Sequence, residues 1–80
     1  MPRLPQVSGR ELVKLLHALG YETLRQRGSH TRLRKITVAG EHNFTAPDHK
    51  ILAKGTLNDI LTSISLWNNI PKQELLDRLT

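Results

Sequence analysis

The spacing of apolar residues changes abruptly at Gly20, and this change limits the possible fold more than any other feature of the chain. Before Gly20, leucines recur at intervals of three and four residues, which is typical of a helix with one buried side. From Tyr21 onward, side chains alternate with the period of two that is typical of a β-strand. The helical stripe consists of Leu12, Leu15, Leu16 and Leu19. We therefore expect a helix followed directly by a sheet.

The ends of the first helix are marked by capping residues. Ser8 and Glu11 have the spacing of a capping box, in which each side chain accepts from the backbone amide of the other residue. Gly20 is suited to the left-handed conformation that ends many helices. The pattern predicts a helix over Gly9 to Leu19, with His17 on its solvated side.

A β-hairpin is predicted around Gly28 and Ser29. A two-residue connection with glycine first is typical of a type II′ turn, whose twist suits antiparallel strands. Strict alternation places Thr23, Arg25 and Arg27 together on one face of the first strand. His30 opens the second strand, where alternation separates two sets: His30, Arg32, Arg34, Ile36 and Val38 on one face, and Thr31, Leu33, Lys35 and Thr37 on the other.

A third strand is expected after a turn at Ala39 to Glu41. It would run from His42 to Ala46, with Phe44 as its clearest core residue. Pro47 should end the sheet because it cannot donate a ladder hydrogen bond.

Two more helices follow in the pattern. The first would have Thr56 as N-cap and Asp59 in the capping-box position, and it would end before a turn over Leu66 to Asn69. Its buried stripe would consist of Leu57, Ile60, Leu61 and Ile64. Pro71 is well placed to begin a short final helix, whose leucines at 75, 76 and 79 would cover an edge of the core.

The order of elements defines the expected fold class. It is α+β, α-β-β-β-α with a three-stranded antiparallel sheet, helices on one face and a short C-terminal helix. The length of 80 residues suits a single domain, 1–80, with a shallow site and no enclosed cofactor cavity.

The amino-acid composition limits the kinds of binding partner and cofactor that this chain can have. A formal net charge of +5 and a sequence pI near 10.3 favour polyanions such as RNA, DNA, anionic lipid or an acidic protein. The absence of cysteine removes disulfides and cysteine-based zinc sites, and His42 and His49 lack metal-ligand spacing, so no metal and no cofactor is expected. No segment has the apolar length of a membrane span, and the start of the chain lacks an apolar run. We therefore expect a cytoplasmic protein without a membrane partner.

The stretch from Arg25 to Lys35 is the leading candidate for a functional site. Five of the chain's 12 Lys and Arg residues lie in it: Arg25, Arg27, Arg32, Arg34 and Lys35. Arginines suit bidentate phosphate contacts, so these residues together with Ser29 are our candidates for phosphate binding. The alternative is a solvated strand whose charges only prevent edge aggregation.

His30 lies within this basic stretch. Its near-neutral pKa would suit it to remove the 2′-hydroxyl proton or to protonate the departing 5′ oxygen during RNA cleavage. A single histidine in a basic strand is more often a binding or structural residue than a catalytic one. Asp48 could orient His49, which makes His49 a candidate supporting residue.

Several short motifs together resemble the HicA family of toxin ribonucleases from toxin-antitoxin pairs. They are Leu19-Gly20-Tyr21, the Arg-x-x-Gly-Ser-His turn over Arg25 to His30, Pro47 and His49, and Gly55-Thr56-Leu57 with Ile60-Leu61. The resemblance spans roughly Ser8 to Ile64. It implies a double-stranded-RNA-binding-like fold and metal-independent cleavage of mRNA, with His30 as the catalytic residue. It also implies a HicB-type antitoxin that covers the active face.

Two other functions remain open from the sequence. The same basic face would suit a non-catalytic double-stranded RNA-binding module, which would bind by shape and depend strongly on salt. It would also suit a small adaptor that docks an acidic protein.

Overall fold

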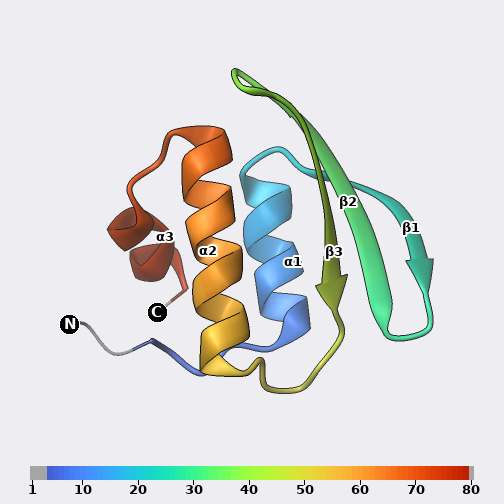
Figure 1. Ribbon diagram of the computed structural model, residues 1–80. Coiled ribbons are helices and arrows are strands. Elements are labelled where there is room, and N and C mark those ends of the chain that lie inside the picture. Colours follow the sequence, from blue (N-terminus) through green and yellow to red (C-terminus); the bar gives the residue numbers. More distant parts are fainter. Residues whose placement is uncertain (1–3, 80) are drawn as a thin grey trace.

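The fold is a three-stranded antiparallel sheet with helices on one face, as expected for a double-stranded-RNA-binding-like α+β domain (Figure 1). The computed structural model describes residues 4–79. Its elements are α1 (Gly9–Ala18), β1 (Glu22–Arg27), β2 (His30–Thr37), β3 (Gly40–Pro47), α2 (Lys54–Asn68) and α3 (Lys72–Arg78). Within this part of the chain, no helix has both the length and the apolar character needed to cross a membrane.

Helix α1 begins at Gly9 as predicted and ends at Ala18, one residue before the predicted end, with Leu19 as its C-cap. The Ser8 hydroxyl accepts from the Glu11 amide at 3.1 Å, and the Glu11 carboxylate accepts from the Ser8 amide at 3.3 Å. Gly20 has a φ of 101°, a conformation that side chains rarely adopt. The leucine stripe faces the sheet, and Leu12 and Leu16 are fully buried.

The core lies between the helices and the inner face of the sheet. Leu33 is the central residue of β2 on that face, and it is fully buried together with leucines and isoleucines from α1 and α2. The fully buried partners are Leu12, Leu16, Leu57, Leu61 and Ile64. The opposite face of the sheet has no helix over it (Figure 1).

Strand β1 departs from the predicted alternation at a β-bulge. From the turn, Arg27 pairs with His30, Gln26 with Thr31 and Arg25 with Arg32, but Leu33 pairs with Thr23, so Leu24 is the extra residue. A bulge inserts one residue and reverses the faces beyond it. The prediction that Thr23 shares a face with Arg25 and Arg27 was therefore wrong: Thr23 lies on the face of Leu33, and the two arginines lie on the other.

Strand β3 is longer than predicted. The turn comprises Val38 and Ala39, and the strand already begins at Gly40 and ends at Pro47. The end at Pro47 was predicted. Phe44 is only half-buried, whereas Ala46 and His42 are the buried residues of this strand.

The start of α2 was predicted wrongly. The helix begins at Lys54, with Ala53 as an N-cap that has no side-chain hydrogen bond, so Thr56 lies inside the helix. It continues to Asn68, through most of the predicted turn, and Asn69 ends it with a φ of 52°. Pro71 was expected to begin the final helix; it is the N-cap of α3, which begins one residue later at Lys72.

A series of polar side chains joins the sheet to α2 near the β2–β3 turn. The buried Tyr21 hydroxyl lies 2.5 Å from Nδ1 of His42 and accepts from Nδ2 of Asn68 at 3.0 Å. Asn68 accepts from Nζ of Lys35 at 2.6 Å. Among the described residues, no buried side-chain nitrogen or oxygen lacks a hydrogen-bond partner, so this polar series can join the sheet to α2 without leaving a buried group unsatisfied.

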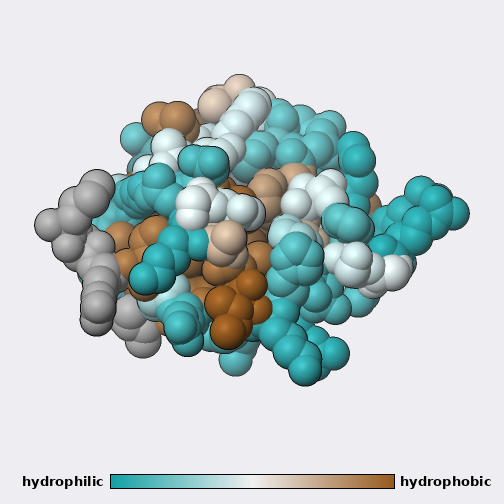
Figure 2. All heavy atoms as spheres, turned by 60° about the horizontal axis from the view of Figure 1, so that its bottom comes forward, coloured by the Kyte–Doolittle hydropathy of each residue, from teal (hydrophilic) through white to brown (hydrophobic). Residues whose placement is uncertain are grey.

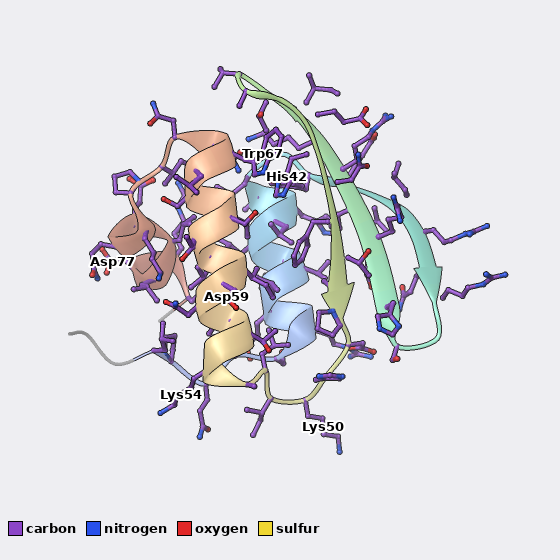
Figure 3. The ribbon with its side chains drawn as sticks, viewed as in Figure 1. His42, Lys50, Lys54, Asp59, Trp67 and Asp77 are labelled. Atoms are coloured by element: carbon purple, nitrogen blue, oxygen red, sulfur yellow. The ribbon has the colours of Figure 1, made fainter. Side chains whose placement is uncertain are left out.

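His42 is a buried member of this series and has partners on several sides. Its ring stacks on Trp67 with centroids 4.8 Å apart and planes 6° apart (Figure 3), and Nε2 lies 3.5 Å from the Ser63 hydroxyl. Burial lowers the pKa of His42 from its ordinary value of 6.5, and burial likewise raises the pKa of Tyr21 against an opposing hydrogen bond from Asn68. A neutral imidazole that accepts at Nδ1 and donates from Nε2 fits these contacts.

The lowered pKa of His42 predicts a loss of stability in mild acid. The unfolded chain binds a proton at His42 more readily than the folded chain does, so this contribution to stability is complete above about pH 6.5 and decreases as the pH falls. In urea titrations, the free energy of unfolding should fall less between about pH 7.5 and about pH 5 in His42→Gln than in the wild type. The exposed His17, changed to Gln, is the control and should retain the wild-type dependence. Equal pH dependence in His42→Gln and the wild type would contradict this prediction.

Candidate functional site

The site begins at the turn between β1 and β2. Gly28 has a φ of 57°. Among residues 4–79, Asn69 is the sole non-glycine residue with a positive φ, so the φ of Ser29 is negative. This combination agrees with the predicted type II′ turn and excludes type I′, which needs a positive φ at both positions. The turn therefore depends on glycine at position 28.

Two other segments support this turn. The backbone amide of Asp48, just after β3, donates to the Ser29 carbonyl at 2.6 Å, and the amide of Gly9 donates to the His49 carbonyl at 2.8 Å. A Cβ on Gly9 would lie 2.0 Å from the Pro47 carbonyl oxygen, so α1 begins in direct contact with the end of β3. The hairpin, the β3–α2 connector and the start of α1 thus form one joined edge, the lower edge in Figure 1.

His30 is the first residue of β2 and its side chain is exposed on the uncovered face of the sheet. It pairs with Arg27 on β1 and with Pro47 on β3. The Ser29 hydroxyl lies 3.4 Å from Nδ1, close enough to orient the ring while Nε2 stays available to a ligand. His30 therefore has the exposure that a proton-transfer group needs.

Three arginines surround His30 on the same face. Arg27 pairs with His30, and Arg25 pairs with Arg32, so the register set by the two-residue turn places both β1 arginines on the face of these β2 residues. All three arginines are exposed. We call Arg25, Arg27, His30 and Arg32 the basic surface. Such a group of exposed guanidinium ions attracts phosphates.

Arg34 lies further along β2 and has acidic partners. Its guanidinium donates to Glu22 at 2.8 Å and lies 3.7 Å from Glu41. The hydrogen bond and charge of Glu22 raise the pKa of Arg34, with a smaller contribution from Glu41. The net positive charge of the open face is therefore concentrated near the turn.

The other predicted site residues lie elsewhere. Lys35 is half-buried on the helix-covered face, where it donates to Asn68, so it does not belong to the basic surface. Ser29 lies in the turn, and His49 is exposed in the connector. The His49 side chain lines a hollow together with Ser8, Arg10, Asp48 and Lys50.

Sequence reasoning missed the two glutamates that face Arg34. The two-residue turn sets a register that would place Leu24 opposite Leu33, and no feature of the sequence marks Leu24 as an extra residue. Glu22 reaches its place opposite Arg34 through that extra residue. Within residues 4–79, no three His, Asp or Glu side chains gather in a way that could hold a metal ion.

Comparison with protein families identifies the chain. The model of the HicA toxin of bacterial toxin-antitoxin systems matches residues 9–66, which is more than half of the 80-residue chain. The chain belongs to the HicA toxin family. This HicA-family protein is thus the toxin of a toxin-antitoxin system, and its family implies an antitoxin partner. Comparisons with curated proteins and with solved structures gave no match. The matched region includes α1, the sheet and most of α2, and α3 lies outside it.

The turn geometry predicts opposite effects of two Gly→Ala changes. A Cβ would meet nothing within 4 Å at either Gly28 or Gly55, so packing is the same for both. Gly28→Ala should lower the free energy of unfolding by about 1–2 kcal/mol, because alanine is strained at a positive φ. Gly55→Ala, inside α2, should instead raise it by up to about 1 kcal/mol. Chemical denaturation measures both, and an equal change of the same sign would contradict the role of the turn.

Proposed function

We propose that the toxin is an endoribonuclease that cleaves mRNA, with His30 as its catalytic acid or base. The observation that supports this most directly is the position of His30, exposed at the start of β2 with Arg27 as its strand partner and Arg25 and Arg32 on the same face. The resemblance to the HicA family adds the expectation of cleavage without a metal. Because the substrate is mRNA, the toxin would act in the cytoplasm.

The chemistry follows from the 2′-hydroxyl of RNA. Transfer of the 2′ proton to a base allows the 2′ oxygen to attack the adjacent phosphorus, and the bond to the 5′ oxygen breaks as that oxygen gains a proton. The products are a 2′,3′-cyclic phosphate and a 5′-hydroxyl. His30 would carry out one of these two proton transfers, and its ring nitrogens suit either one near neutral pH.

The arginines of the basic surface would supply the second requirement. The phosphorus passes through a five-coordinate state with added negative charge, and guanidinium groups placed beside it stabilise that charge more than the charge of the ground state. Arg25, Arg27 and Arg32 would bind phosphates and provide this stabilisation. Arg34 would contribute less, because Glu22 already compensates its charge. His49, in the adjoining connector, is the candidate supporting residue.

The antitoxin would be of the HicB type and would cover the basic surface. A partner that presents carboxylates to Arg25, Arg27 and Arg32 would match their charge and exclude RNA from His30 at the same time. Such complementarity would explain how one protein both binds and inhibits the toxin.

Replacement of His30 tests the catalytic proposal. His30→Ala and His30→Gln should reduce the rate of mRNA cleavage by about 10²–10⁴-fold, the usual contribution of one proton-transfer group. Cleavage of labelled mRNA in the presence of EDTA measures the rate and tests independence from metals. Because the side chain is exposed, thermal unfolding should not change.

Lys14→Gln provides the control for this test. Lys14 is an exposed cation of α1, and it lines a hollow with Ala18 and Leu79, away from the hairpin. This variant should cleave mRNA at the wild-type rate. Unchanged cleavage by both His30 variants would disprove the assignment, and RNA binding by the wild type without any product would favour the non-catalytic RNA-binding module.

A further inference from the structure

A hollow at the lower edge of the molecule continues from the hairpin to the connector. Two neighbouring hollows share Arg10 and Asp48 in their walls. The first lies between α1 and the hairpin and reaches Gln26, Thr31 and Pro47, and the second reaches Ser8, His49 and Lys50. Since the two share these side chains, they are adjacent, and we call them together the groove.

The groove begins beside His30. Pro47, in its wall, is the strand partner of His30, and Asp48 donates its amide to the Ser29 carbonyl. A ligand bound at His30 therefore needs to pass only the end of β3 to reach Arg10 and Lys50. The backbone hydrogen bond between the turn and the connector fixes the position of His30 relative to this part of the groove.

The distribution of charge favours this direction for a polyanion. Along β2, the open face beyond Arg32 has Arg34 with Glu22 and Glu41 as partners, so it offers little net positive charge. The lower edge has Arg10 and Lys50 in the groove, against the single carboxylate of Asp48. Lys54, the first residue of α2, lies at the same edge as Lys50 (Figure 3).

Surface polarity agrees with this direction. Figure 2 turns the lower edge toward the viewer, and hydrophilic side chains prevail on the side of the hairpin, while apolar ones gather under the helices. A phosphate backbone that leaves the basic surface would thus meet charged and polar groups at this edge before it meets an apolar area.

The geometry also restricts the form of the RNA. The basic surface is on the uncovered face of the sheet, whereas Arg10 belongs to α1, on the covered face. A ligand that contacts both must bend around the end of the sheet. A single strand bends at every nucleotide, whereas a duplex is stiff over this distance and presents a broad A-form surface.

We propose that the groove lined by Arg10, His49 and Lys50 binds the backbone of single-stranded RNA on one side of the bond that is held at His30. This inference rests on the proposed function in that it takes RNA as the substrate, and it adds the class of RNA and the course of the strand. Arg10 and Lys50 each contact a phosphate, and Asp48 opposes binding.

Salt-dependent RNA binding tests this proposal. In a His30→Ala background, which prevents cleavage, the affinity for a short oligouridine is measured by fluorescence anisotropy over a series of salt concentrations. Arg10→Gln and Lys50→Gln should each reduce the slope of log affinity against log salt by about 0.7, the value for one phosphate contact with a single strand. The same relation gives a loss of about five-fold in affinity at about 0.1 M salt.

Two further variants separate binding from a structural effect. Asp48→Asn should strengthen binding, a direction that loss of structure does not produce. Arg78→Gln removes one positive charge from α3, outside the groove, and should leave the slope unchanged. A duplex RNA of equal length should show smaller effects of Arg10→Gln and Lys50→Gln than the single strand does.

The results distinguish this inference from the catalytic proposal. Slopes unchanged by both Arg10→Gln and Lys50→Gln, or equal effects on duplex and single strand, would overturn the groove while leaving cleavage by His30 untouched. Conversely, the salt slope of RNA binding could be reduced in both Arg10→Gln and Lys50→Gln while the wild type cleaves no mRNA. This result would support RNA binding in the groove and refute the endoribonuclease.

Discussion

The β-bulge at Leu24 is the local constraint that limits the positive charge of the open face to the end near the β1–β2 turn. Without the extra residue, β1 would keep one register from the turn to its start, and Glu22 would not face Arg34. Arg25 and Arg27 keep the register of the turn, and the bulge acts beyond them: it moves Thr23 to the face of Leu33 and sets Glu22 opposite Arg34. The bulge costs one ladder position, and it changes only the start of this edge strand, where Glu22 then faces Arg34 and Thr23 faces Leu33.

The second constraint is the backbone at the lower edge. The amides of Asp48 and Gly9 donate to the carbonyls of Ser29 and His49, so segments from three parts of the chain meet beside His30. These bonds involve only main-chain atoms and do not depend on the side chains of the site. The exposed residues of this edge can therefore serve binding and chemistry while the backbone beneath them stays in place.

At the opposite end, the polar series around His42 holds the sheet to α2. It also explains why Lys35, the last cation of the basic stretch, does not belong to the basic surface: its ammonium group is engaged by Asn68, 5.8 Å from the centre of the Tyr21 ring. The molecule thus separates two uses of polar groups. Those near the β2–β3 turn are satisfied internally and stabilise the fold, and those near the β1–β2 turn are exposed.

The sequence by itself determined the elements whose signals are local. Backbone chemistry within a few residues accounts for the capping box of α1, the stop at Gly20, the turn at Gly28 and Ser29, and the end of the sheet at Pro47. The α+β order follows from the succession of helical and strand patterns along the chain. Only the tertiary structure decided the bulge at Leu24, the early start of α2 at Lys54 and the partners of Arg34 and Lys35. These features depend on contacts between residues distant in the chain, where burial of Leu33, Leu57 and Leu61 outweighs local propensity and register. The sequence therefore named His30 and its arginines and placed Lys35 on the other face of β2, while the tertiary structure decided which of these cations are engaged by partners.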